Sequence, residues 1–271
     1  MPEEPLRDPE APPVELIAVR ADNPGPMTLT GTVSYVVRDD DDSWVVDPGP
    51  RDPEHLAELL LCCEGTHPRG VLVTHHHEDH AAGAAALARR LGARSGHAVP
   101  LWAADQQRVA GSDPLPSQLI GAHGTVGHII HTPGHTADSV CVLLDGGRLL
   151  SGDTLLGGSS TVLIPEHGGS VAEHLQSLAI LRAMTIDGRI GSIHPGHGPA
   201  IEGPHEAVEV LEQQIAHRRE RIDQVRRARS AGVLTLDRLL RVVYGPDLAE
   251  ELHEPARHTL RAILAHLTEG G

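Results

Sequence analysis

The chain has 271 residues, enough for one α/β domain with a large core and a smaller appendage. Its formal net charge of −15 argues against broad, non-specific nucleic-acid binding, which depends on neutralising phosphates. It contains no Lys, which excludes Schiff-base and P-loop lysines, and its three Cys predict a fold without disulfides in a reducing compartment.

The N-terminal third alternates between strand patterns and turns. Residues 1–13 are acidic and Pro-rich, and we expect them to be disordered. Apolar runs at 14–20, 32–37 and 44–46 predict strands, and the last ends in the turn Asp47-Pro48-Gly49-Pro50. We interpret Asp47 as a turn residue near the site described next. The pair Asp52-Pro53 is typical of a helix start and predicts a helix to about Cys63.

The densest motif is His75, His77, Asp79 and His80, an H-x-H-x-D-H array. The apolar run before it, residues 70–74, predicts a buried strand, and the Ala-rich run 79–91 predicts a helix. The four side chains therefore lie on a strand-to-helix turn, where open α/β sheets place their sites. Imidazole and carboxylate donors suit Zn²⁺ or a similar ion. His75 and His77, two residues apart, are placed to share one ion, and Asp79 and His80 to face a second.

Three further ligand candidates follow predicted strands. His135 comes after the strand 126–131 and a Pro-Gly turn, and supplies a third ligand for the first ion. Asp153 follows the hairpin 139–150, and a carboxylate with two oxygens suits a bridge between two cations. His197 follows the strand 190–193 in the run H-P-G-H-G and completes the second set.

The remaining sequence predicts a substrate loop and a helical tail. Residues 157–169 form a Gly/Ser-rich loop, and we expect Ser159, Ser160 and Thr161 to border the substrate. Helices are predicted at 170–184, 204–230, 236–243 and 254–267. The segment 217–229 carries six Arg, for which a solvated face with local ion pairs is favoured over a nucleic-acid surface.

Taken together, the runs T-H-H-H-E-D-H, H-T-P-G-H-T, S-G-D-T and H-P-G-H-G, with Asp47-Pro48-Gly49, resemble the metallo-β-lactamase superfamily. The resemblance covers about residues 14–203 and implies an α/β fold, an αββα sandwich with metals at the sheet edges. It implies that one ion is held by His75, His77 and His135, the other by Asp79, His80 and His197, and that Asp153 bridges them. None of the three Cys occupies a motif position, so the site is similar to the glyoxalase II and ribonuclease branches.

The tail carries a second resemblance. The runs H-R-R-E-R-I and L-T-L-D-R-L-L-R-V-V-Y-G are similar to the mitochondrial lactamase-like endoribonuclease family and its bacterial relatives. This implies that residues 204–271 form a small helical, winged-helix-like domain after the metal-hydrolase domain at 14–203. It also implies cleavage of single-stranded RNA.

These patterns predict a hydrolase with two Zn²⁺ ions, and Mn²⁺ or iron would suit the same donors. A bridging hydroxide would attack the substrate, with Asp79 as the catalytic residue that orients it and accepts its proton. The substrate is single-stranded RNA or, alternatively, a small thioester, lactone or ester. A mononuclear iron persulfide dioxygenase is a third alternative. It needs only part of the ligand set, so the presence of all seven ligands argues against it.

No stretch is apolar enough to span a membrane or to serve as a leader, so a cytoplasmic protein with no membrane partner is expected. The acidic composition weakens the RNA alternative. The scarcity of aromatic side chains weakens it as well, because bases stack on aromatic rings. The sequence carries no signal for an oligomeric state.

Overall fold

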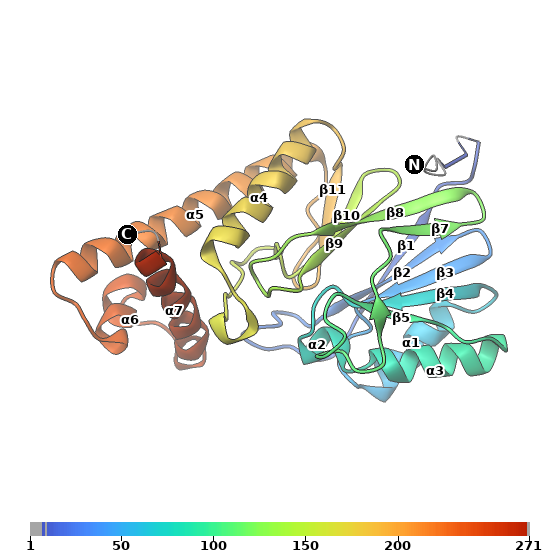
Figure 1. Ribbon diagram of the computed structural model, residues 1–271, viewed down its shortest axis with the longest axis horizontal. Coiled ribbons are helices and arrows are strands. Elements are labelled where there is room, and N and C mark those ends of the chain that lie inside the picture. Colours follow the sequence, from blue (N-terminus) through green and yellow to red (C-terminus); the bar gives the residue numbers. More distant parts are fainter. Residues whose placement is uncertain (1–6, 9, 270–271) are drawn as a thin grey trace.

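The computed structural model describes residues 7–8 and 10–269 and shows two sheets packed face to face with helices on both outer sides (Figure 1). The first sheet has the order β1 (Glu15–Arg20), β2 (Val33–Asp39), β3 (Asp42–Val46), β4 (His67–Leu72), β5 (Leu101–Ala103), β6 (Asp113–Pro114). The second has the order β11 (Ser192–Pro195), β10 (Arg148–Gly152), β9 (Val140–Leu144), β8 (Gly124–His131), β7 (Gln118–Gly121). The expected αββα sandwich is therefore confirmed.

Strand alternation assigns each side chain to one layer of the sandwich. In β3, Trp44 and Val46 point inward and pack in the core between the two sheets, and Trp44 is only 2% exposed. Val45 between them points outward and packs with Leu56 of α1 (Pro53–Cys62) and Leu87 of α3 (Ala84–Ser95). The second sheet alternates in the same way. Its outward-pointing side chains pack against α4 (Val171–Ile186) and α5 (Pro204–Ser230), which cover its outer face.

The helix start at Asp52 is confirmed, since its carboxylate accepts hydrogen bonds from the backbone N–H groups of Glu54 and His55 at 2.9 and 2.8 Å. The single helix expected over 79–91 is wrong. Two helices occur instead, α2 (Glu78–Ala81) and α3, with Gly83 before the second. A Cβ atom at Gly83 would lie 2.9 Å from the carbonyl oxygen of Pro48, and the Gly83 N–H donates to Gly49 O at 3.1 Å. The break lets the turn after β3 pack against the ligand segment.

The C-terminal unit lies at one end of the sandwich and is built on α5 (Figure 1). The first half of α5 packs on the second sheet through Leu211 and Ile215, and its second half packs through Ile222 and Val225 in a separate core. That second core joins α5 to α6 (Leu236–Tyr244) and α7 (His253–Glu269). One long helix therefore fixes the tail relative to the sandwich.

Short 3-10 turns, η1 (Pro165–His167) and η2 (Glu250–Leu252), complete the described elements. Part of the segment expected to be disordered, residues 1–6 and 9, lies outside the described residues. Within the rest, Arg7 contacts Asp39 at 2.7 Å and Asp145 at 3.3 Å. Among the described helices, none combines the length and apolar character needed to cross a membrane.

Candidate metal centre

The seven side chains predicted as metal ligands meet at one edge of the sandwich. The H-x-H-x-D-H array, residues 75–80, follows β4 and runs into the first turn of α2. The other three residues, His135, Asp153 and His197, each follow a strand of the second sheet. Close ligand-atom groups join all seven: His75, His77, Asp79, His80, His135, Asp153 and His197. The loops at this edge thus assemble a donor set from four separate parts of the chain.

The first group is made of three imidazoles. His77 Nδ1 lies 3.1 Å from His75 Nε2 and 3.0 Å from His135 Nε2. Three nitrogens around one tetrahedral ion with bonds of about 2.0–2.1 Å would lie roughly 3.3 Å apart. Burial lowers the pKa of His77 to about 3 and also lowers those of His75 and His135, with neighbouring imidazoles adding to the effect. All three rings are therefore neutral, as metal ligation requires.

The second group combines two imidazoles with a carboxylate. His197 Nε2 lies 3.2 Å from His80 Nε2 and 3.1 Å from Asp79 Oδ2. Burial acts to lower the pKa of His80, but the surrounding carboxylates outweigh it and raise this pKa well above its usual value. Burial conversely acts to raise the pKa of Asp79, yet the neighbouring imidazoles bring it down to about 2. Unlike the first group, this group offers a carboxylate oxygen beside its two nitrogens, and a cation bound here would take the place of the His80 ring proton.

Asp153 lies between the two groups. Its Oδ2 is 3.6 Å from His135 Nε2 in the first group, and its Oδ1 is 3.4 Å from His80 Nε2 and 3.5 Å from His197 Nε2 in the second. Within the described part of the chain, Oδ1 is buried and has no hydrogen-bond partner. A buried carboxylate oxygen without a hydrogen-bond partner is unusual, and a position beside a cation would account for it. The donor set therefore fits two divalent ions that share this carboxylate.

Asp47 is hydrogen-bonded directly to His80 of the second group and, through Thr74, to His75 of the first. Its Oδ2 accepts hydrogen bonds from His80 Nδ1 at 2.8 Å and from Thr74 Oγ1 at 2.7 Å, and its Oδ1 accepts one from Thr74 N at 2.7 Å. The Thr74 hydroxyl in turn lies 3.1 Å from His75 Nδ1. Our interpretation of Asp47 as a turn residue missed this role. The available signal was its position directly after a buried strand at the same sheet edge.

The other ligand imidazoles also have a hydrogen-bond partner on the ring nitrogen that faces away from the ligand groups. His135 Nδ1 donates to Val162 O at 2.8 Å, and His77 Nε2 lies 2.8 Å from His167 Nδ1. His197 Nδ1 lies 3.4 Å from Gly31 O. Such contacts fix ring orientation and tautomer in metal sites. No motif in the sequence pointed to His167, which lies ninety residues away from its partner.

A further cluster, His76, His77 and His167, is explained by hydrogen bonds. His76 Nδ1 lies 2.7 Å from Asp138 Oδ1, and its Nε2 accepts from Arg108 Nη1 at 2.8 Å. Because both ring nitrogens of His76 have partners, this cluster needs no ion. The His76 ring instead ties the ligand turn to the Asp138 loop.

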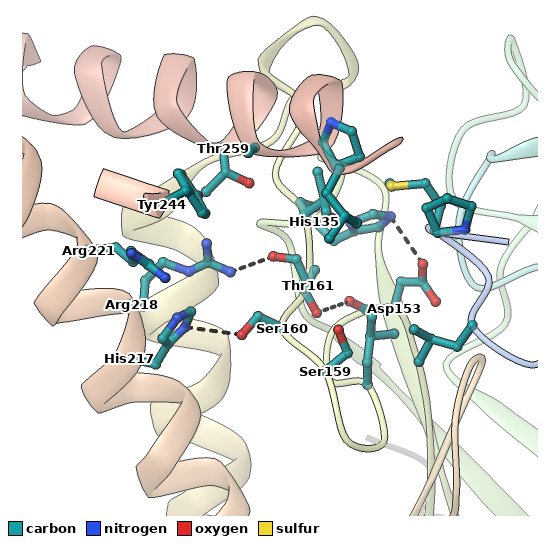
Figure 2. Close-up of a pocket in the computed structure, with 18 of the residues that line it drawn as sticks. His135, Asp153, Ser159, Ser160, Thr161, His217, Arg218, Arg221, Tyr244 and Thr259 are labelled. Carbon is teal, nitrogen blue, oxygen red and sulfur yellow. Dashed lines mark hydrogen bonds and ion pairs between the residues drawn. The ribbon is translucent and has the colours of Figure 1, made fainter. Parts of the chain in front are cut away.

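A cavity of about 210 Å³ opens onto the centre from the side of the C-terminal unit (Figure 2). His135 and Asp153 form one end of it, and Ser159, Ser160 and Thr161 lie along its wall. The Thr161 hydroxyl donates to Asp153 O at 2.9 Å. Residues from the loop 26–29 and from α5, α6 and α7 complete the lining, which is mainly apolar. The cavity is therefore built jointly by the sandwich and the helical tail.

Residues 27–197 match the model of the metallo-beta-lactamase superfamily, and residues 235–271 match that of the beta-lactamase associated winged helix domain. The second match confirms the winged-helix-like tail.

Individual relatives agree with these matches. A hydroxyacylglutathione hydrolase of Anaeromyxobacter dehalogenans is 36% identical over 74% of this chain and 74% of its own length. A beta-lactamase-like protein 2 homolog of Drosophila melanogaster is 29% identical over 78% of this chain and 72% of its own. A crystal structure of a beta-lactamase domain protein from Burkholderia ambifaria superposes with a TM-score of 0.74 at 21% identity, covering 98% of this chain and 88% of that one.

Proposed function

Since this chain belongs to the metallo-beta-lactamase superfamily, we propose that it is a hydrolase with a dinuclear metal centre that acts on small esters or thioesters. The observation that carries this proposal is the position of Asp153, with one carboxylate oxygen near each of two ligand groups. A single ion would leave one of these groups without a cation.

The proposed ligands follow the two groups. His75, His77 and His135 would hold one ion, Asp79, His80 and His197 the other, and Asp153 both. Zn²⁺ is the ion that these nitrogen and oxygen donors suit best, and Mn²⁺ or iron would fit the same set. Divalent ions in such a site supply an activated water and polarise the carbonyl oxygen of the substrate.

The protein's own groups complete the proposed mechanism. The Asp79 side chain is 27% exposed, whereas those of His80 and His197 are buried, so Asp79 is the most accessible ligand of the second group. It is placed to orient the water and to accept its proton. Asp47 and Thr74 hold the rings behind it, which limits the reorganisation needed during reaction.

The cavity supports a small substrate. Its volume of about 210 Å³ lies below the roughly 300–1,000 Å³ of pockets that enclose a whole drug-sized ligand. It therefore suits one arm of a substrate, such as the acyl group of a thioester, while the thiol or alcohol extends from the other side of the centre. The similarity to a protein named hydroxyacylglutathione hydrolase supports this class.

Single-stranded RNA is the second candidate substrate. One observation favours it, namely that four arginines of α5 are exposed: Arg219, Arg226, Arg227 and Arg229. One of them, Arg226, is paired with Asp223, and the net charge of −15 opposes a phosphate backbone. A small ester requires no such basic surface.

The test is hydrolysis by zinc-loaded protein of a panel of acyl thioesters, lactones and aryl esters, beside end-labelled single-stranded RNA. Chelated protein and the His77→Ala variant are the controls. Thioester or ester turnover that both controls lose would support the proposal. RNA cleavage with the same dependence, and no ester turnover, would replace it with the ribonuclease.

A further inference from the structure

Arg218 is a charged side chain buried in the wall of the cavity. It is 2% exposed, and its Nη2 donates to the carbonyl oxygen of Thr161 at 2.6 Å. That bond fixes the guanidinium beside the substrate loop and uses one of its five N–H donors. Arg218 lies across the cavity from Asp153 and His135 (Figure 2).

Arg221 brings a second guanidinium to the same wall from the next turn of α5. Its Cζ lies 4.5 Å from the centroid of the Tyr244 ring, and its Nη1 donates to Gln224 Oε1 at 2.9 Å and to Val243 O. Within the described residues, its Nε is buried without a hydrogen-bond partner. The ring and these acceptors hold Arg221 in place without neutralising its charge.

The described cavity lining supplies no carboxylate to the pair apart from one metal ligand. Among the described residues that line the cavity, the only acid is Asp153, which belongs to the metal centre. Burial lowers the pKa of Arg218 to about 10, and Arg221 lowers it further while Tyr244 opposes this. Arg218 is still charged at neutral pH. Buried charges in proteins are normally paired, so the buried Arg218 beside the half-buried Arg221, without an anion in the cavity lining outside the metal centre, indicates a ligand that supplies one.

We propose that Arg218 and Arg221 form a carboxylate subsite, and that the acyl group of the substrate carries a carboxylate at the end remote from the scissile bond. Apolar side chains of the cavity lining, including Leu156 and Leu248, would contact the intervening methylene groups. A guanidinium matches a carboxylate with two parallel hydrogen bonds, which an apolar chain end cannot accept. This inference rests on the proposed function, which it narrows to ω-carboxyacyl esters or thioesters.

The test uses chain-matched thioesters of N-acetylcysteamine. Glutaryl and pentanoyl thioesters differ only at the far end of the acyl group, and succinyl and adipyl thioesters vary its length. We expect kcat/KM of the zinc-loaded wild type to be at least tenfold higher for one of the carboxylated substrates than for the pentanoyl compound. Glutarate should also bind at least tenfold more tightly than pentanoate by calorimetry, a measurement that needs no turnover.

Variants assign these effects to the subsite. Arg218→Met should bring two ratios close to one: the kcat/KM of the carboxylated over the pentanoyl thioester, and the affinity for glutarate over pentanoate. Arg218→Lys should keep part of both, because an ammonium retains the charge but loses the two parallel N–H donors of a guanidinium. Arg219→Met removes the same charge from the neighbouring exposed position and should keep both ratios. If circular dichroism shows that Arg218→Met is unfolded, Arg218→Lys and Arg221→Gln provide the comparison.

The two proposals can fail separately. Turnover of the succinyl, glutaryl and adipyl thioesters that is no faster than that of the pentanoyl thioester, together with equal binding of glutarate and pentanoate by the wild type, would overturn the subsite and leave the hydrolase standing. Binding of glutarate that depends on Arg218, without hydrolysis of any ester, would support the subsite and overturn the hydrolase. Ratios that Arg219→Met abolishes as fully as Arg218→Met would also overturn the subsite.

Discussion

Replacing Asp47 by Asn should weaken metal binding although Asp47 is not among the proposed ligands. The carboxylate accepts hydrogen bonds from His80 Nδ1, from the Thr74 hydroxyl and from the Thr74 backbone N–H. An amide in its place still accepts the backbone N–H, but its NH₂ group would face the His80 N–H. Two donors would then oppose each other in a buried position, since Asp47 is 2% exposed.

The magnitude follows from these contacts. A hydrogen bond to a charged group is worth about 1.5–3 kcal/mol, and loss of such a partner behind a ligand typically costs about 10–100-fold in metal affinity. We therefore expect an affinity loss of about 1.4–2.8 kcal/mol at the group that contains His80. Asn is the appropriate replacement because Asp47 has a φ of 50°, which Asn tolerates and Ala does not.

The assay is a zinc titration against a chromophoric chelator of known affinity, with the two binding steps fitted separately. Asp40→Asn is the matched control, since Asp40 has a φ of 55° and is exposed in a hairpin. Unchanged affinity in both steps for a folded Asp47→Asn protein would refute the reasoning.

The other predictions concern the shared ligand, the tail core and acid stability. His77→Ala and Asp153→Ala should each reduce hydrolysis to background while far-UV circular dichroism stays native, and substantial turnover by either would contradict the shared centre. Leu260→Ala should lower the unfolding free energy in urea by about 2–5 kcal/mol, because Leu260 is fully buried in the tail core; a loss below about 1 kcal/mol would argue against that packing. Burial, aided by a nearby Arg, lowers the pKa of His174 to about 3, so the unfolded chain takes up a proton between about pH 6.5 and 3 that the folded chain does not. Stability should therefore fall with pH through that window, by up to about 1.4 kcal/mol per unit from this group, and His174→Gln should remove that part of the slope in pH-dependent urea melts.

The sequence alone indicated an α/β domain and the candidate ligands for local physical reasons, and the resemblance of its motifs to a known family implied the αββα arrangement. The apolar run 44–46 predicted a strand, and the cap at Asp52 predicted a helix start. His135, Asp153 and His197 each follow a predicted strand. Loops at the ends of neighbouring strands meet at one sheet edge. The sequence therefore predicted that these three residues lie close to the H-x-H-x-D-H array.

Only the tertiary structure decided what depends on distant partners. The break at Gly83 exists because a turn more than thirty residues earlier in the chain packs against it. Asp47 and Arg218 look in the sequence like a turn residue and one of six solvated arginines, yet one is buried behind His80 and the other in the cavity wall. The chemistry of a polar side chain depends on its burial and on the groups it faces, and these are set by long-range packing that a local pattern does not contain.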